Sequence, residues 1–168
     1  MHDDIIFNNH NWGRALLKQF ENTEYGILGI AGKTDLSTDY DEVNCWSWSV
    51  GRLKHQINGK LINTFISNRY EYPIQVVCLD GVFLVVHRNR IRQKFDIRFK
   101  GFQFYDISFT FSNHLYGVKV GVTFDVDLTH KSGGSYNQEW HQNRLLFLQI
   151  YKDSLPCRIR PDKIEYNP

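Results

Sequence analysis

The sequence YDISFTFSNHLYGVKVGVTFDV, residues 105–126, decides the fold class because it joins a helical pattern to a strand pattern across one glycine. Residues 105–116 end at Gly117, a residue type that commonly follows the last turn of a helix, and we predict a helix there. From Val118 to Val126 apolar residues alternate along the chain, which is the period of a strand. A helix that leads directly into a strand predicts an α/β domain of mixed α/β and α+β character.

Working outward from this stretch, residues 53–66 carry the clearest hairpin signal in the chain. Leu53–Ile57 and Lys60–Ile66 are strand-like, and the Asn58-Gly59 pair between them tolerates the positive φ angles of a tight turn. Further strands are expected at 25–31, 74–79 and 82–86, and a loop at 33–44. One helix is expected after Asn11. A second helix, opened by a capping box at Ser135, is expected to carry Trp140, Arg144, Phe147 and Tyr151. We expect one domain over residues 1–155 and an extended C-terminal tail over 156–168.

Length and composition exclude several classes of protein. The chain has 168 residues, 42% of them hydrophobic, and a formal net charge of +2, which argues against a disordered protein and against a general nucleic-acid binder. Its three cysteines form no CxxC pair, so neither a disulfide framework nor a zinc knuckle is indicated. The sequence shows neither a signal-peptide pattern nor an apolar run approaching the ~20 residues of a membrane span. We therefore expect a soluble, cytoplasmic protein.

Two acidic motifs are candidates for chemistry. In His2-Asp3-Asp4 adjacent carboxylates precede an apolar run and could hold a hard divalent cation, although a solvated acidic segment is the simpler interpretation. Tyr105-Asp106 stands at the start of the predicted helix, where an Asp is most simply an N-cap.

Three further motifs have a functional and a structural interpretation. His130 precedes the turn Ser132-Gly133-Gly134-Ser135 and a predicted helix, which resembles an anion site but also fits a flexible turn. Asp80-Gly81 ends an apolar run, where a simple turn is the more common structure. Basic residues alternate over 87–94 and could contact phosphate, although a charged surface loop is more common.

Short motifs occur along the chain in a specific order: Gly29-Ile30-Ala31-Gly32, Trp46 and Trp48, Gly51–His55, Leu79–Phe83, Phe95-Asp96, Phe99–Ile107, Gly117–Val122, His130–Ser135 and Glu139-Trp140. Over residues 1–150 this series resembles the family 2-like glycosyltransferases of the streptomycin-biosynthesis type. The resemblance implies the C-terminal portion of a GT-A-like domain, a mixed sheet with flanking helices and a β-hairpin. It also implies that a nucleotide-binding half would precede His2-Asp3-Asp4, so we expect this chain to turn over sugar nucleotides poorly.

The resemblance further implies a reaction and roles for individual residues. The reaction is metal-dependent, inverting transfer of a sugar from a nucleotide-sugar donor to a hydroxyl of a glycan or a lipid-linked acceptor, the latter met at the inner membrane face. Asp106 would be the general base, and Asp3, Asp4 and His130 would hold a Mg²⁺ or Mn²⁺ ion. For this reason we expect Asp4 and His130 to face one another. Substrate-binding roles would fall to Asp80, Gly81, Trp46, Trp48, Tyr105, Ser132, Gly133 and Gly134.

Two departures from the family pattern lie around Asp106. Gln103 stands in place of a His and Ser108 in place of a second Asp, which would change acceptor preference or activity. Two alternatives to an enzyme stay open. One is a non-catalytic remnant that binds a glycan or a partner protein, and the other is a nucleic-acid-binding domain that uses the basic run 88–94.

Overall fold

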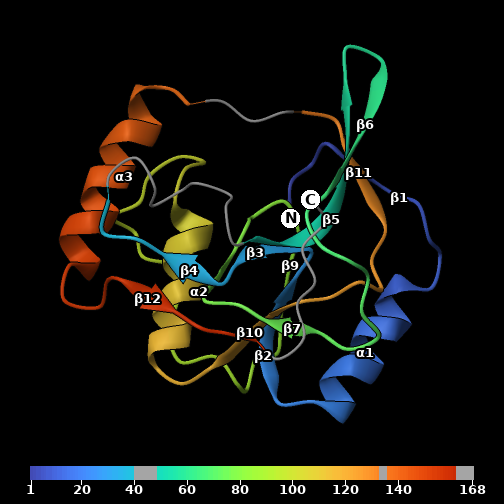
Figure 1. The fold of residues 1–168 in the computed structure, drawn as a ribbon, viewed down its shortest axis with the longest axis horizontal. Helices are drawn as coiled ribbons and strands as arrows, with labels where there is room; N and C mark the ends of the chain where they lie inside the picture. Colours follow the sequence, from blue (N-terminus) through green and yellow to red (C-terminus); the bar gives the residue numbers. More distant parts are fainter. Residues whose placement is uncertain (40–48, 133–135, 162–168) are drawn as a thin grey trace.

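The computed structural model describes residues 1–39, 49–132 and 136–161 and shows a mixed α/β fold, as the sequence predicts (Figure 1). Within these ranges the helices are α1 (Trp12–Asn22), α2 (Tyr105–Leu115) and α3 (Gln138–Tyr151). Helices α2 and α3 lie side by side on one flank, α1 lies on the opposite flank, and the curled sheets lie between them (Figure 1). None of the helices in the described ranges is long and apolar enough to cross a membrane.

The described strands form three sheets. The largest has the order β1 (Ile5–Phe7), β11 (Leu128–His130), β5 (Ser49–Ile57), β3 (Ala31–Lys33), β8 (Cys78–Leu79), with β6 (Lys60–Phe65) also paired to β5. The second has the order β7 (Ile74–Gln75), β10 (Lys119–Val122), β2 (Tyr25–Gly29), β9 (Leu84–Val86), and the third pairs β12 (Cys157–Arg158) with β4 (Asp35–Leu36). Parallel pairs (β11 with β5, β10 with β2) and antiparallel pairs occur together, so the sheets are mixed.

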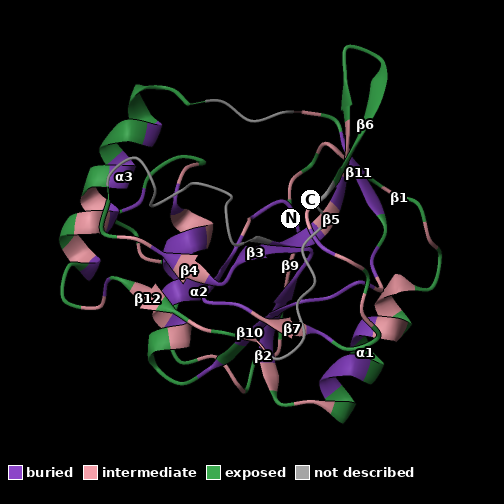
Figure 2. Ribbon diagram, viewed as in Figure 1, coloured by how far each residue is buried: buried purple, intermediate pink, exposed green. Residues whose placement is uncertain are grey.

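The predicted hairpin is confirmed as β5 and β6. Asn58 and Gly59 adopt φ angles of 51° and 75° at its tip, the left-handed values that a tight two-residue turn requires. The hairpin projects from the body of the molecule and its tip is exposed (Figures 1 and 2).

Four predicted strands are shorter or divided in the structure, and of the predicted strand 82–86 only residues 84–86 form β9. Residues 25–31 contribute to two strands, β2 and β3, in different sheets, and residues 74–79 divide into β7 and β8, also in different sheets. The predicted strand 118–126 ends at Val122. An apolar run does not distinguish one continuous strand from two short strands in successive sheets. The predicted loop 33–44 includes β4, and its residues 40–44 lie outside the described part of the chain.

The helices begin and end close to the predicted residues, whereas their N-terminal capping hydrogen bonds differ from the predicted ones. Helix α2 ends before Gly117, whose φ is 79°, as its sequence pattern predicts. Helix α3 is capped by Asn137, whose side-chain oxygen accepts a 2.9 Å hydrogen bond from the Trp140 N–H. The capping box assigned to Ser135 was therefore wrong by two positions, and Ser135 itself lies outside the described residues. Asn11 precedes α1, but its side chain makes no capping hydrogen bond.

Apolar clusters join the helices to the sheets and hold the site in place. Phe104, Phe111 and Phe147 pack with Leu155 between α2 and α3, and all four are at least nine-tenths buried. Leu16 and Phe20 of α1 pack on the other flank. The described part of the predicted tail also contacts the body of the molecule, because β12 pairs with β4.

One residue of the basic run 88–94 has a structural role. The Arg90 guanidinium donates hydrogen bonds to the carbonyl oxygens of Phe20, Thr23 and Tyr25 at 2.8–3.0 Å. These carbonyls lie where α1 ends and β2 begins, so Arg90 closes the C-terminal end of the helix.

Candidate active site

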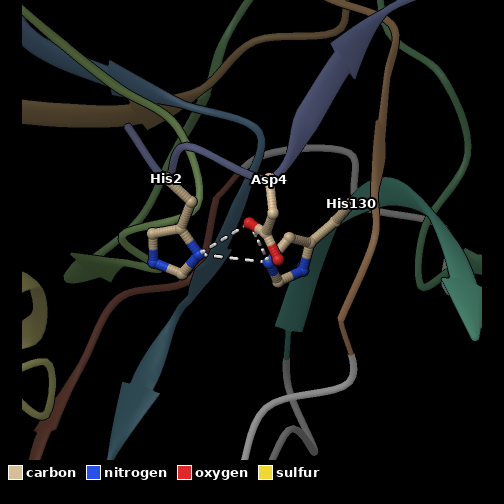
Figure 3. A group of neighbouring side chains, drawn as sticks. All are labelled: His2, Asp4 and His130. Atoms are coloured by element: carbon tan, nitrogen blue, oxygen red, sulfur yellow. Dashed lines mark hydrogen bonds and ion pairs between the residues drawn. The ribbon is translucent and has the colours of Figure 1, made fainter.

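The first part of the site is a cluster of His2, Asp4 and His130 (Figure 3). Strand β1 pairs antiparallel with β11, with Ile5 opposite His130, and the Lys131 N–H donates to the Asp4 carbonyl at 2.9 Å. This pairing places residues 2–4 against the end of β11. The expected approach of Asp4 to His130 is confirmed, since Oδ1 of Asp4 lies 3.2 Å from Nε2 of His130.

Several polar atoms converge on the same nitrogen of His130. Nδ1 of His2 lies 3.1 Å and Oγ of Ser132 lies 3.0 Å from Nε2 of His130, and Nδ1 of His2 lies 3.9 Å from Oδ1 of Asp4. His55 supports this arrangement, because its Nδ1 lies 3.0 Å from the carbonyl oxygen of Ser132. Nε2 of His130 thus has three polar neighbours within hydrogen-bond distance, and a single nitrogen makes one strong hydrogen bond at a time.

The charges of this cluster leave lone pairs available on its ligand atoms. Burial lowers the pKa of His130 and outweighs the raising effect of Asp4, which favours a neutral imidazole. For Asp4 burial acts to raise the pKa, but the hydrogen bond with Ser132 and the charges of His130 and His2 together hold the pKa of the carboxyl below its usual value. A neutral imidazole beside an ionised carboxylate is the state that a divalent cation requires of its ligands.

The ligand group differs from the predicted one in one member. Asp3 is exposed and lies outside the group, while one ligand atom each from His2, Asp4 and His130 lie within 4.8 Å of one another. The spacing of His2 and Asp4 could have signalled this, because residues two apart in an extended chain point to the same side. His55 was not predicted to belong to the site. Its position beside Ser132 depends on the parallel pairing of β11 with β5.

A tight turn at Asp80-Gly81-Val82 connects this cluster to Asp106. On one side the His2 N–H donates to the Val82 carbonyl at 3.1 Å. On the other side the Gly81 N–H donates to Oδ2 of Asp106 at 2.6 Å. Within the turn Oδ1 of Asp80 accepts from the Val82 N–H at 2.8 Å. The predicted metal and base residues thus belong to one hydrogen-bonded unit.

Gly81 is required at the centre of this turn by close packing. A Cβ atom at position 81 would lie 2.5 Å from the hydroxyl oxygen of Tyr105 and 2.8 Å from Oδ2 of Asp106. Both distances are shorter than van der Waals contact. A glycine lets the turn approach the first turn of α2 closely enough for the hydrogen bond to Asp106 to form.

Asp106 does not cap α2, contrary to the simplest sequence interpretation. The N-cap is Phe104, in the left-handed region with φ of 63°, and Asp106 lies in the first turn. Burial and the negative charge of Asp80 raise the pKa of Asp106 to about 7, although backbone N–H groups of Ile107 and Gly81 act in the opposite direction. Desolvation and the charge of the second acid therefore outweigh the hydrogen bonds that favour the ionised carboxylate.

Some of the remaining residues singled out from the sequence lie in the described part of the chain and others lie outside it. Tyr105 is half-buried, and burial together with the charges of Asp106 and Asp80 raises the pKa of its hydroxyl to about 12. Ser108 is buried and lies 3.0 Å from the hydroxyl of Tyr151 in α3, so it faces the core. Trp46, Trp48, Gly133 and Gly134 lie outside the described residues.

A family model described as a glycosyltransferase-like family matches residues 1–151. The chain belongs to this family. Comparison of this glycosyltransferase-like protein with curated proteins finds no match. The matched region contains both His2-Asp4-His130 and the Asp80-Gly81-Asp106 unit, and the family supports a transferase that uses a sugar donor and an acceptor.

Proposed function

We propose that this protein transfers a sugar from a nucleotide-sugar donor to an acceptor hydroxyl, with inversion and with the help of a divalent cation. One observation carries the proposal. The turn at residues 80–82 is hydrogen-bonded to His2 on one side and to Asp106 on the other. It joins a group suited to a cation to a carboxylate suited to a proton transfer, the two elements that glycosyl transfer to a hydroxyl needs.

His2, Asp4 and His130 are the residues that would hold the cation. They fit a divalent ion because two imidazole nitrogens and one carboxylate oxygen converge with mutual distances of 3.1–3.9 Å. When bound, the ion would act as a Lewis acid that neutralises the charge of the departing diphosphate. Mg²⁺ prefers oxygen ligands, whereas transition ions also accept nitrogen ligands, so of the two ions that the sequence resemblance implies we propose Mn²⁺.

Asp106 would accept the proton of the acceptor hydroxyl as that oxygen forms its bond to the sugar. The bond between the sugar carbon and the diphosphate oxygen breaks on the opposite face, so the configuration inverts. A pKa raised to about 7 suits this step, because a base works best when its pKa lies near the working pH. The Gly81 N–H orients the carboxylate by donating a 2.6 Å hydrogen bond to Oδ2.

Asp80 and Tyr105 are proposed to line the acceptor side of the site. Both lie against Asp106, since Asp80 raises its pKa and the Tyr105 hydroxyl packs on Gly81. Trp46, Trp48, Ser132, Gly133 and Gly134 remain proposals for substrate contact, and Ser132 is the one of these that the structure places beside His130.

The direct test is release of nucleoside diphosphate from a panel of nucleotide sugars, with MnCl₂, MgCl₂ or a chelator. We expect weak binding and slow turnover with Mn²⁺, as the sequence resemblance implies, and the loss of both with the chelator and in His130→Ala. His10→Ala is the matched control, because His10 is exposed and outside the cluster. Cation-independent binding of a glycan, with no binding of any nucleotide sugar, would instead support the non-catalytic alternative.

A further inference from the structure

We propose that the loop of residues 94–104, which leads into α2, docks on a lipid surface that carries anionic headgroups. This loop, here called the double-turn loop, lies outside the hydrogen-bonded unit described above. It holds the two most exposed large apolar side chains of the described chain, Ile97 at 89% and Phe102 at 86% exposure. Exposed apolar side chains mark protein or membrane interaction sites when they lie together and are bordered by polar residues, and Phe95 of the same loop is also exposed, at 53%.

Two consecutive tight turns hold these side chains at their tips. In the first turn the Phe99 N–H donates to the Asp96 carbonyl at 3.2 Å, and Ile97 lies at the tip. The Arg98 guanidinium locks this turn through hydrogen bonds of 2.6–3.0 Å to the Asp96 carboxylate. The loop therefore presents Ile97 on an ordered support.

The second turn is held from helix α3. The Asn143 amide donates to the carbonyl oxygens of Lys100 and Gln103, both at 3.1 Å, and Phe102 lies between them. Gly101 adopts a φ of 74° at this turn, which a glycine accommodates readily. This bridge holds the turn against α3, where Gly101 lies beside Glu139, and it leaves Phe102 exposed.

Both tips point away from the same core. Phe99 and Phe104, which flank the second turn, are buried at 5% and 3% exposure, and their rings lie 6.4 Å and 5.6 Å from the ring of Phe147. Phe99 and Phe104 point inward onto Phe147. Phe102, which lies between them, and Ile97, which precedes them, therefore project outward. In Figure 1 this loop lies beside the N-terminal end of α2, on the side of α3.

The charges around the tips favour a lipid surface over a protein partner. Within residues 94–104 Lys94, Arg98 and Lys100 are exposed and the one acid, Asp96, is paired with Arg98; Glu139 of α3 borders Gly101. Lysine is depleted in the cores of protein interfaces, whereas basic side chains beside apolar tips suit anionic headgroups above acyl chains. The excess of basic over acidic groups supplies the charge complementarity.

Docking would also explain how an acceptor reaches the site. The double-turn loop continues directly into Tyr105 and Asp106, so a lipid-linked hydroxyl would arrive next to the proposed base. This last step rests on the proposed function, whereas the docking itself does not.

The test is co-sedimentation of the purified chain with phosphatidylcholine vesicles, with and without about a third of phosphatidylglycerol. No donor or acceptor is present, so failure of the transferase proposal would leave the result unaffected. We expect binding to the anionic vesicles, and a fall in the partition coefficient of at least about tenfold in the double variant Ile97→Ser/Phe102→Ser. Lys94→Gln/Lys100→Gln should lower it by about fivefold for each lysine.

Matched controls change side chains of the same kinds elsewhere. Leu17→Ser/Leu61→Ser removes two apolar side chains that are 65% and 59% exposed, and Lys18→Gln/Lys60→Gln removes two exposed lysines. Neither should alter binding, and all variants should keep their thermal midpoint. Absence of binding to anionic vesicles, or equal losses in the controls, would overturn the proposal. A dimer that Ile97→Ser/Phe102→Ser converts to a monomer would also overturn it, in favour of a second copy of the chain.

Discussion

The Nδ1 atom of His2 lies 3.1 Å from the Nε2 atom of His130, although 128 residues separate them along the chain. Two imidazole nitrogens at this distance repel unless a proton or a cation lies between their lone pairs. The carboxylate of Asp4 lies 3.2 Å from the same nitrogen of His130, and its negative charge would stabilise either occupant, of which we propose a cation. This relationship leads to the first of four predictions.

His2→Ala should weaken Mn²⁺ binding by at least about tenfold, because it removes one of two nitrogen ligands. His10→Ala, on an exposed side chain outside the cluster, should leave the affinity unchanged. Calorimetric titration with MnCl₂ and then MgCl₂ gives both the loss and the preference for Mn²⁺. Equal affinities in His2→Ala and the parent chain would remove His2 from the ligand set.

Asp106→Asn should reduce sugar transfer by roughly 10²–10⁴-fold, the range expected for loss of a general base. The amide oxygen of Asn can still accept the hydrogen bond from Gly81, so the turn should keep its shape. Asp153→Asn, an exposed acid after α3, is the control and should transfer normally. Near-normal transfer by Asp106→Asn would show that this carboxylate has a structural role only.

The raised pKa of Asp106 predicts opposite effects of pH on activity and on stability. Transfer should rise with pH through an apparent pKa of about 7, because the ionised carboxylate is the base. The folded state binds this proton more tightly than the unfolded state, so the stabilisation is full below the ordinary pKa near 3.8 and is lost as pH rises through 7.

Asp106→Asn mimics the protonated form at every pH and reports this effect directly. Because each pKa unit is worth about 1.4 kcal/mol, at pH 8 it should be more stable than the parent chain by up to about 4 kcal/mol, and at pH 4 the two should be nearly equal. Urea unfolding at both pH values measures the difference. A variant that is less stable than the parent chain at pH 8 would contradict the shift.

Gly81→Ala should disrupt the turn that joins the two parts of the site. The added Cβ would lie 2.5 Å from the Tyr105 hydroxyl and 2.8 Å from Oδ2 of Asp106, and overpacking of this kind costs about 1–3 kcal/mol. Gly13→Ala in α1 is the control, since nothing lies within 4 Å of its Cβ position and Ala favours helix. Thermal unfolding should separate the two variants, and equal midpoints would mean that the turn adapts to the extra carbon.

Local features of the fold could be predicted from the sequence because neighbouring residues determine them. Asn58-Gly59 specifies the turn of the β5–β6 hairpin through its left-handed backbone angles, and Gly117 ends α2 for the same reason. The places where prediction failed involve distant pairing. Residues 74–79 look like one strand, but β7 pairs with β10 and β8 pairs with β3, so the run divides between two sheets.

The sequence by itself determined which residue types were available for chemistry, among them Asp4, His130 and Asp106, and the order in which they occur. Only the tertiary structure decided that His2 joins Asp4 and His130 in place of Asp3, because the pairing of β1 with β11 selects which side chains meet. It also decided the direction of the Asp106 pKa shift. That shift depends on burial and on Asp80, which is distant in sequence but is brought against α2 by the Gly81 turn. Electrostatic and desolvation effects act through space, so their balance exists only once the chain has folded.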